Sequence, residues 1–392
     1  MKSWSFFICL CAAIPAGIAQ TRLPLIHSGS EKAIIIDGKY VKTDWQFDPN
    51  ANQDTYYVNV PRADSRVIFR TDQAELKFKT RFGREYNFLV VLNNKDTCHI
   101  CISAKDGPAV RQAVTGHSYP DTIPFMLKGA RVYLAGKLNG DHAVTIQLDF
   151  GAGGAIVNKM VSEQLALQFD GKTMTSNTQG LNEARASTHN RLEIGHQQWT
   201  NLPFTEVGNM QMGEDVIIGN GLFRDKVIEL DYDNKVLIVY NNLPSKAKKY
   251  RVQPVYYEQD RPKFEATIMQ NNQPFNFWFL FDTGRDGTML IGKDFTGQSD
   301  NWNKLQALMV LPDGRKIVRL DAVISGQKIK DIVTNAADPV NAASRPTLIG
   351  NQVLNHFNVI LDNPRGLLYL KPNGRWKEPY SNYDDYLKTI KK

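Results

Sequence analysis

Two aspartates of this 392-residue chain stand where a carboxyl group could do chemistry. Asp149 ends the apolar segment 144–148, Asp282 ends the apolar segment 277–281, and each aspartate is followed two positions later by a glycine. A carboxyl group at the end of a buried strand can act as a general acid or base, because its surroundings set its pKa. The Asp-x-Gly motif is common in turns, so the two copies are informative only if they belong together.

An internal repeat joins the two motifs. Gly219 ends an Ile-Ile-Gly segment 70 residues after Asp149, and Gly350 ends a Leu-Ile-Gly segment 68 residues after Asp282. Each segment is followed by a further apolar strand that ends in aspartate. Two elements repeated in the same order at nearly equal spacing predict two similar lobes. A duplicated β-domain without catalysis would explain the repeat, but it would not explain why an aspartate ends both strands.

The residues of this repeat resemble those of the aspartic peptidases. The segment 282–284, Asp-Thr-Gly, matches the family motif fully, and the segment 149–151, Asp-Phe-Gly, departs from it at one position. The chain is similar to pepsin in having two lobes and to the retropepsins in lobe size, and it looks like the secreted, duplicated members found in bacteria. The resemblance covers about residues 122–374. It implies an all-β, bilobed, pepsin/retropepsin-like double-β-barrel fold, which a small β-sandwich-like domain precedes in this chain.

The resemblance also implies a site. Asp149 and Asp282 would meet across a pseudo-twofold axis as the catalytic pair, without a metal or a cofactor. Two carboxylates about 3 Å apart cannot both ionise cheaply, so they share one proton. One then takes a proton from a water molecule, while the other donates a proton toward the carbonyl group of a peptide. The residues expected to support the pair are Gly151, Ala152, Ile218, Gly219, Thr283, Gly284, Ile349 and Gly350.

Two departures from the family pattern bear on activity. Phe150 replaces the threonine or serine whose hydroxyl normally bonds across to the other lobe, and its bulky ring could push the two loops apart. Arg285 places a cation beside Asp282, which would lower the pKa of that aspartate and favour ionisation of both carboxyl groups. The alternative is that its side chain points away and pairs with Asp286 or the surface. We predict a secreted aspartic-type endopeptidase. The alternative is a catalytically impaired pseudopeptidase that binds extended peptides or another polymer in the same cleft.

A cleft of this kind needs a cover, and two hairpins are candidates. In the family a hairpin of the first lobe folds over the substrate, and the polar segment 178–191, with a bend near Gly180, is the candidate in this chain. The segment 309–320, which turns at the Pro-Asp-Gly of residues 312–314, is the equivalent in the second lobe.

The rest of the chain indicates further domains. Between residues 22 and 105, short runs of alternating apolar and polar residues are separated by turn residues, as in a small β-sandwich. These runs are 33–36, 55–60, 66–69 and 86–92. The organisation that we expect is a signal peptide (1–19), an accessory β-domain (22–105), a linker (106–121), two peptidase-like lobes (122–245 and 246–374) and a C-terminal tail (375–392).

The first residues are typical of an export signal. Lys2 supplies the positive start, residues 6–14 form an apolar stretch too short to span a membrane, and the Gly-Ile-Ala of residues 17–19 fits a small-x-small cleavage site. We therefore expect a mature chain that starts near Gln20 and lies in the periplasm or outside the cell. A lipid-anchored start at Cys11 and a buried N-terminal helix are the rival interpretations.

Composition restricts the partners. The chain has 47 Lys and Arg against 40 Asp and Glu, a net charge of +7, with the two signs interspersed. This pattern and the export signal argue against nucleic acid as a partner, and no segment after the signal is apolar enough to span a membrane. Cys98 and Cys101 follow a strand-like run, where positions three apart face opposite sides, so we expect them to be structural rather than metal-binding. The expected protein is a monomer that acts on a peptide or protein substrate.

Other catalytic classes lack their motifs. The sequence contains no Gly-x-Ser-x-Gly elbow and no His-Glu-x-x-His metal motif. The glycines of residues 151–154 follow a strand, but they lack the spacing and the alternating βα pattern of a nucleotide-binding loop.

Overall fold

The computed structural model describes residues 23–38, 40–49, 53–58, 65–81, 83–105, 111–112, 119–177, 180–298, 300–340 and 346–380. The chain divides into two compact units, Met1–Ala109 and Val110–Lys392. The predicted signal peptide, most of the predicted linker and residues 381–392 of the predicted tail lie outside the described residues. Two residues of that linker form a short strand, β9 (Arg111–Gln112), which pairs with β17 (Gln197–Val207) in the second unit.

The N-terminal unit consists of two four-stranded sheets around one core. The alternating residues of its strands put one apolar face of each sheet into this core, because successive side chains of a strand point to opposite faces. Phe69 of one sheet meets Phe88 of the other edge to face, with ring centroids 4.9 Å apart. Cys98 and Cys101 are both buried and free. The sheets have the orders β1-β7-β8-β4 and β3-β2-β5-β6, with β1 (Leu25–Ser28), β2 (Lys32–Asp37), β3 (Tyr40–Gln46), β4 (Asp54–Tyr57), β5 (Ser65–Arg70), β6 (Glu75–Thr80), β7 (Glu85–Leu92) and β8 (Asp96–Ser103).

The first lobe of the second unit is a closed barrel of six strands in the order β12-β13-β18-β14-β17-β16. The barrel closes where β16 pairs back to β12, with Glu193 opposite Lys137. Closure leaves no free edge among the six strands, and large side chains such as Trp199 and Phe204 fill the interior. The remaining strands of this lobe are β11 (Met126–Lys128), β12 (Arg131–Leu138), β13 (His142–Leu148), β14 (Ala155–Asn158), β15 (Gly171–Asn177), β16 (Gly180–Ile194) and β18 (Val216–Ile218).

The second lobe repeats this barrel with the same strand order, β22-β23-β28-β24-β27-β26. It closes where β22 pairs with β26, with Thr267 opposite Val323. The repeat found in the sequence is therefore a repeat of whole barrels. The strands are β22 (Arg261–Gln270), β23 (Gln273–Asp282), β24 (Met289–Ile291), β25 (Ala307–Val310), β26 (Lys316–Ile324), β27 (Gln327–Ala336) and β28 (Leu348–Gly350).

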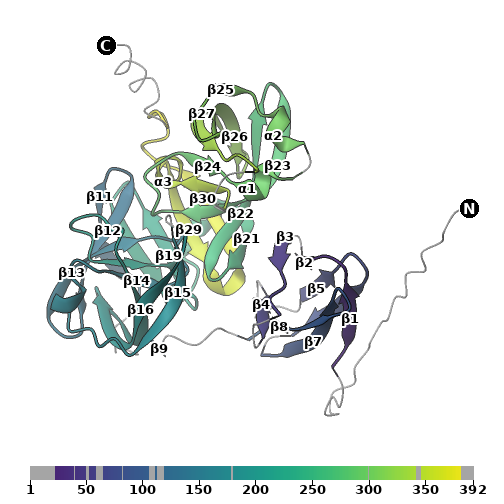
Figure 1. Ribbon diagram of the computed structural model, residues 1–392. Coiled ribbons are helices and arrows are strands. Elements are labelled where there is room, and N and C mark those ends of the chain that lie inside the picture. The colour runs from purple at the N-terminus through teal and green to yellow at the C-terminus, as the bar shows by residue number, and fades with distance from the viewer. Residues whose placement is uncertain are drawn as a thin grey trace, which may run out of the picture. The chain divides into compact units, whose positions relative to one another are not determined.

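A sheet shared by both lobes joins the barrels, with the order β10-β20-β19-β29-β30-β21. Its central pairing is antiparallel, with Ile228 of β19 opposite Leu361 of β29. In Figure 1, β29 and β30 lie between the teal strands of the first lobe and the green strands of the second. The strands are β10 (Asp121–Pro124), β19 (Val227–Asp231), β20 (Val236–Tyr240), β21 (Arg251–Glu258), β29 (Phe357–Asp362) and β30 (Leu367–Pro372).

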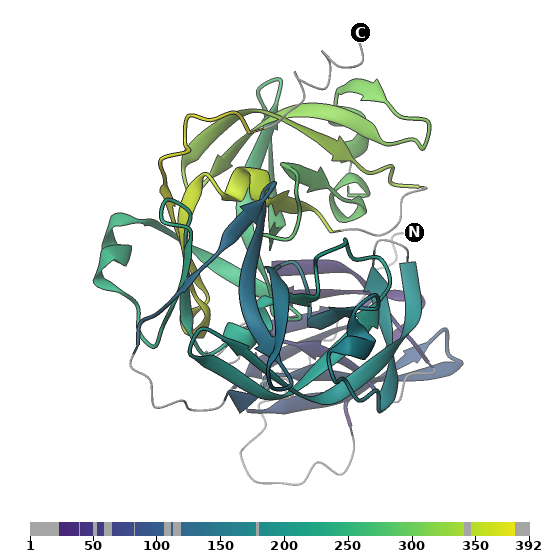
Figure 2. The same cartoon turned by 90° about the vertical axis from the view of Figure 1, so that its left-hand side faces the viewer.

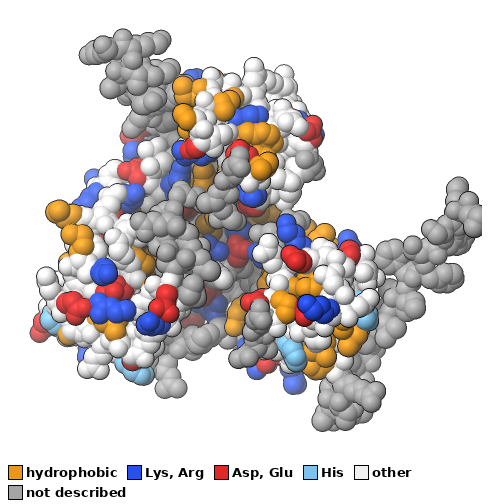
Figure 3. Space-filling view, viewed as in Figure 1, with side chains coloured by type: hydrophobic (Ala, Val, Ile, Leu, Met, Phe, Trp, Pro, Cys, Tyr) orange, Lys and Arg blue, Asp and Glu red, His pale blue; other side chains and the backbone are white. Residues whose placement is uncertain are grey.

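The predicted fold class is confirmed: the chain is all-β and bilobed, with a pepsin-like pair of barrels after a small β-sandwich-like domain. None of the helices in the described part of the chain is long and apolar enough to cross a membrane. On the face drawn in Figure 3, positive and negative side chains are interspersed. The helices are α1 (Lys293–Thr296), α2 (Asn301–Lys304), α3 (Asn351–Leu354) and the 3-10 turns η1 (Ser162–Gln164), η2 (Asn220–Phe223), η3 (Ser245–Lys249) and η4 (Asn363–Arg365).

Candidate active site

Two parallel strands of the first lobe place Asp149. β13 and β18 pair as far as Leu148 and Ile218, and the Asp149 N–H donates to the Ile218 carbonyl at 2.9 Å. Leu148 and Ile218 are fully buried, so the apolar strand ends fix the backbone and leave the carboxyl group beyond them. A Cβ on Gly219 would lie 2.2 Å from the Ala152 carbonyl oxygen, so the strand passes beside the Asp149 loop only because this residue is glycine.

The second lobe places Asp282 in the same way. β23 and β28 run parallel, with Phe281 opposite Ile349 and Asp282 opposite Gly350. Phe281 and Ile349 are buried, and a Cβ on Gly350 would lie 2.3 Å from the Gly287 carbonyl oxygen. The two Asp-x-Gly loops therefore have matching surroundings, as two copies of one structural element should.

The two loops bring their carboxyl groups into contact. A Cβ on Gly284 would lie 2.2 Å from Asp149 Cγ, and a Cβ on Gly151 would lie 2.8 Å from Asp282 Cγ, so each glycine makes room for the carboxyl group of the other lobe. The two carboxyl groups lie close enough that each affects the pKa of the other. Within the loops, the Gly151 N–H donates to Asp149 Oδ1 at 2.7 Å and the Gly284 N–H donates to Asp282 Oδ1 at 3.0 Å.

Both carboxyl groups are half-buried, and both pKa values are raised. Burial is the main cause of the raised pKa of Asp149, and the neighbouring charge of Asp282 adds to it. Burial also raises the pKa of Asp282, although the interaction with Asp149, the charge of Arg285 and backbone N–H groups act in the opposite direction. Because the two groups titrate together, the pair retains one proton at pH values where an isolated aspartate is ionised.

One hydroxyl group ties the two loops together. Thr283 Oγ1 accepts a hydrogen bond from the Phe150 N–H at 2.9 Å and donates one to the Leu148 carbonyl at 2.8 Å. The Phe150 ring is buried, with its centroid 6.1 Å from that of the Phe281 ring. The ring therefore packs into the core and does not separate the loops, while the hydroxyl bridge runs from the second lobe only.

The charge of Arg285 shifts the pKa of Asp282 in the predicted direction, but the predicted net lowering of that pKa does not occur. The Arg285 charge lowers the pKa of Asp282, yet burial has the larger effect and the net shift is upward. The side chain lies along the neighbouring glycines, since a Cβ on Gly287 would be 3.2 Å from Arg285 Nε and a Cβ on Gly350 would be 3.2 Å from Arg285 Cδ. The expectation that this cation leaves both carboxyl groups ionised is not supported by the direction of the shift.

Two asparagines that the sequence analysis did not single out link the lobes reciprocally. Asn220 of the first lobe donates its side-chain amide to the Asp260 carbonyl at 3.1 Å, and Asn351 of the second lobe donates its amide to the Ala130 carbonyl. In Figure 2 the blue hairpin of β11 and β12 accordingly reaches the yellow helix α3. Each asparagine directly follows the glycine of the apolar-apolar-Gly segment, so the recurring Gly-Asn pair was the available signal.

The predicted hairpins are placed differently in the two lobes. In the second lobe, β25 and β26 form the predicted hairpin, and Gly314 in its turn has a positive φ of 84°. In the first lobe the hairpin consists of β15 and β16, with Asn177 opposite Gly180 and residues 178–179 outside the described residues. The predicted segment 178–191 therefore covers mainly the second strand; the first strand was missed because its polar sequence has no apolar alternation.

The site offers carboxyl groups and backbone N–H donors. In the residues that the structure describes, no group of three or more His, Cys, Asp or Glu side chains could hold a metal ion. A carboxyl pair that retains one proton presents a base and an acid side by side, which is the equipment for activating a water molecule against a carbonyl group.

Solved structures resemble this chain, whereas sequence comparisons do not match it. No family model and no curated protein matches the sequence. An aspartic proteinase from Irpex lacteus matches in structure with a TM-score of 0.47 and 10% sequence identity, over 67% of this chain and 100% of that chain. The strand pairings, and not this match, establish the fold.

Proposed function

We propose that the chain is an aspartic-type endopeptidase that hydrolyses peptide bonds with a water molecule activated by the Asp149 and Asp282 pair. The observation that supports this most directly is the contact of the two carboxyl groups, each accommodated by the glycine of the opposite loop. A side chain at either position would collide with the carboxyl group of the opposite lobe, so glycine at both positions allows the carboxyl groups to meet.

In this proposal the pair works as one acid–base unit. The ionised carboxylate accepts a proton from the water molecule, and the protonated partner donates its proton toward the oxygen of the peptide carbonyl. The N–H groups of Gly284 and Arg285, which donate to Asp282 Oδ1 at 3.0 and 2.9 Å, stabilise its ionised form. The roles belong to the pair rather than to one residue, because the titrations are coupled.

The second candidate is a pseudopeptidase that binds an extended peptide without cutting it. Phe150 favours this alternative, because it removes one of the two hydroxyl groups that would hold the loops. Catalysis depends on geometry to within a fraction of an ångström, so a loop held from one side alone could bind but not turn over substrate.

We also propose that the protein is exported, is monomeric and acts in the periplasm or outside the cell. The positive start, the short apolar stretch and the small-x-small site of the first 19 residues support this. N-terminal sequencing of the protein from an extracytoplasmic fraction should find a start near Gln20. A lipid-modified Cys11 at the N-terminus would instead support the anchored alternative.

The test of function is cleavage of a diverse peptide library from about pH 3 to pH 8, beside an Asp149→Asn Asp282→Asn variant. We expect wild-type cleavage at acidic pH, where the pair holds one proton, and none by the variant. Retained peptide binding with no cleavage at any pH would refute the endopeptidase and leave the binding protein.

A further inference from the structure

One peptide unit beside Asp282 is held from both sides. Its N–H, that of Arg285, donates to Asp282 Oδ1 at 2.9 Å. Its carbonyl, that of Gly284, accepts from Arg131 Nε at 2.9 Å and from Gln147 Nε2 at 3.1 Å. A carbonyl oxygen has two lone pairs, so both donors are accommodated. Arg131 is on β12 and Gln147 on β13, so the first lobe reaches across to the catalytic loop of the second.

This geometry connects the Arg131 guanidinium to the Asp282 carboxyl group through one planar peptide unit. A peptide unit is planar, so fixing its carbonyl also fixes the direction of its N–H. Hydrogen bonds on the two ends of one peptide polarise it in the same sense, and each strengthens the other. The Arg131 guanidinium therefore acts on Asp282 without touching it.

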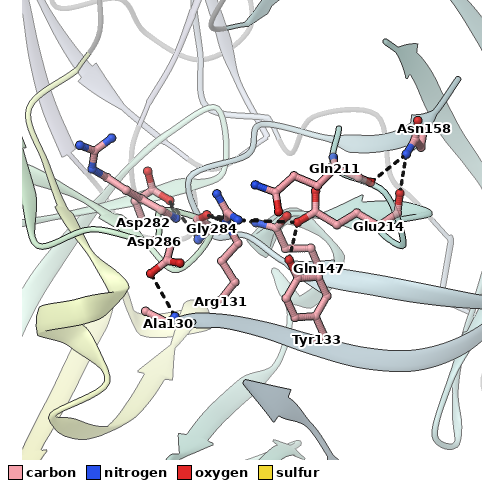
Figure 4. A network of polar contacts seen from close by, with 11 residues as sticks. Ala130, Arg131, Tyr133, Gln147, Asn158, Gln211, Glu214, Asp282, Gly284 and Asp286 are labelled. Atoms are coloured by element: carbon pink, nitrogen blue, oxygen red, sulfur yellow. Dashed lines mark hydrogen bonds and ion pairs between the residues drawn. The ribbon is translucent and has the colours of Figure 1, made fainter. Parts of the chain in front are cut away.

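Arg131 lies beside a buried carboxylate, that of Glu214 (Figure 4). Glu214 Oε1 lies 3.9 Å from Arg131 Nη1 and accepts a hydrogen bond from the Tyr133 hydroxyl. Glu214 Oε2 accepts from the Gln211 N–H at 3.0 Å, and the residue is only 5% exposed. Because both oxygens are hydrogen-bonded, Glu214 presents a fixed negative charge 3.9 Å from the Arg131 guanidinium.

The corresponding arginine of the second lobe does something else. Arg131 is the first residue of β12 after a two-residue turn, and Arg261 is the first residue of β22 after the equivalent turn. Arg261 Nε donates to the Glu258 carbonyl at 3.1 Å and its guanidinium lies 3.4 Å from the Glu258 carboxylate, so it bonds within its own hairpin. The contact with a catalytic loop is thus a property of Arg131 and not of the repeat.

We propose that Arg131 and Gln147 are positioning residues. Their two hydrogen bonds to the Gly284 carbonyl, which we call the clamp, fix the Asp282 loop and so take over the role of the hydroxyl that Phe150 lacks. Thr283 ties the Asp149 loop to the second lobe, and the clamp ties the Asp282 loop to the first. The inference rests on the proposed function insofar as it concerns turnover, whereas the clamp itself concerns only the ionisation and geometry of Asp282.

Several charged groups around Asp282 affect its pKa together with the clamp. Asp149 lies beside Asp282, and the Arg285 side chain contributes a lowering of the pKa of Asp282. Arg131 lies across the peptide with Glu214 behind it, and the exposed Asp286 accepts the Ala130 N–H at 3.1 Å. With these charges left in place, loss of the clamp weakens the Arg285 N–H bond and raises the pKa at which the pair ionises.

Arg131→Met and Gln147→Met each remove one donor with little change in side-chain length. For each we expect kcat to fall about tenfold, the factor that follows from loss of one hydrogen bond of this kind, with KM nearly unchanged and the acidic limb of the pH profile moved to higher pH. Arg131→Lys should recover part of the loss, and Arg261→Met, the matched control, should behave as wild type. Lowered thermal stability in Arg131→Met and Gln147→Met with unchanged kcat and acidic limb would overturn the proposal. If Arg131→Met fails to fold because Glu214 loses its cation, Gln147→Met decides.

A separate experiment tests whether the clamp takes over the role of the hydroxyl that is missing at position 150. Phe150→Thr and Phe150→Val leave cavities of the same shape, but only threonine restores the hydroxyl. Arg131→Met should cost less kcat in the Phe150→Thr background than in the Phe150→Val background. Equal losses in the two backgrounds would overturn this part of the proposal.

Titration of ¹³C-labelled aspartate carboxyl groups in the full chain separates the two proposals. The Asp149 and Asp282 pair should ionise at higher pH in Arg131→Met than in wild type and in Arg261→Met. If wild type cleaves no peptide, the endopeptidase proposal fails and this titration still decides on the clamp: an unchanged titration overturns it, and an upward shift supports it.

Discussion

Replacing Thr283 by valine exchanges its hydroxyl for a methyl group and leaves the side-chain shape unchanged. Thr283 is fully buried, and its oxygen is the partner of the Phe150 N–H and of the Leu148 carbonyl. Each buried backbone group left without a partner costs about 1–3 kcal/mol, and burial of the new methyl group returns about 1 kcal/mol. Thr283→Val should therefore lower the free energy of unfolding by about 1–5 kcal/mol, and about 3 kcal/mol is the central expectation. The loosened Asp149 loop should lower kcat by about 100-fold.

Thr283→Ser is the matched control, because it keeps the oxygen and loses only the methyl group. Its expected cost is about 1 kcal/mol, with kcat close to that of wild type. Urea unfolding measured by tryptophan fluorescence and cleavage of a peptide identified in the library provide the two readouts. The reasoning is refuted if valine and serine have equal effects, because the hydroxyl would then contribute nothing that the methyl group does not.

Substitutions at Gly284, Asp149 and His356 test the site and its surroundings. Gly284→Ala should abolish cleavage, because the new Cβ would lie 2.2 Å from Asp149 Cγ, whereas Gly154→Ala, with nothing within 4 Å of its Cβ, should retain it. Asp149→Asn should raise the melting temperature at neutral pH. Because the folded state raises the pKa of Asp149, the stability that this group contributes is full below its unfolded pKa of 3.8 and is lost as pH rises through the folded pKa. The gain in melting temperature should therefore disappear below about pH 4. His356 is buried against Tyr380, and burial lowers its pKa from 6.5 to about 4. As pH falls through this range, the unfolded chain binds a proton at this histidine and the folded chain does not. The free energy of unfolding should therefore fall by up to about 3 kcal/mol.

Each of these has a direct check. Cleavage by Gly284→Ala at the rate of Gly154→Ala would contradict the contact between the loops. A melting temperature of Asp149→Asn that does not exceed that of wild type at pH 7 would contradict the raised pKa. For the histidine, His356→Phe should flatten the dependence of unfolding free energy on pH between about 4 and 6.5, and an unaltered slope would assign acid lability to other groups.

The local pattern of the sequence predicted the elements that carry the site. Apolar runs ending in Asp-x-Gly became β13 and β23, and the Ile-Ile-Gly and Leu-Ile-Gly segments became the parallel strands β18 and β28 beside them. These are short-range signals, because burial of a strand is written in its own residues. The first strand of the first-lobe hairpin, β15, was missed because its residues are polar and its pairing with β16 depends on backbone hydrogen bonds.

Contacts between distant residues could not be predicted in this way. From the sequence, Phe150 lacked a hydroxyl and its ring could push the loops apart, whereas the structure buries the ring in the core and bonds the Phe150 N–H to Thr283, 133 positions away. Arg131 lies 153 positions before Gly284, and nothing in the composition of its strand distinguishes it from Arg261, which occupies the equivalent place in the other lobe. These contacts depend on which residues of the two closed barrels face each other in the folded chain.

The sequence by itself determined that there are two copies of one element and that each copy carries an aspartate at the end of a buried strand, because periodicity, burial and repeat spacing are properties of the chain read in order. Only the tertiary structure decided how the copies differ: Thr283 holds one loop, Arg131 and Gln147 hold the other, and burial outweighs the charge of Arg285 at Asp282. The physical reason is that these hydrogen bonds depend on distances of a few ångströms between groups that the sequence separates by more than a hundred residues, and that the pKa of Asp282 depends on how far the folded chain buries it.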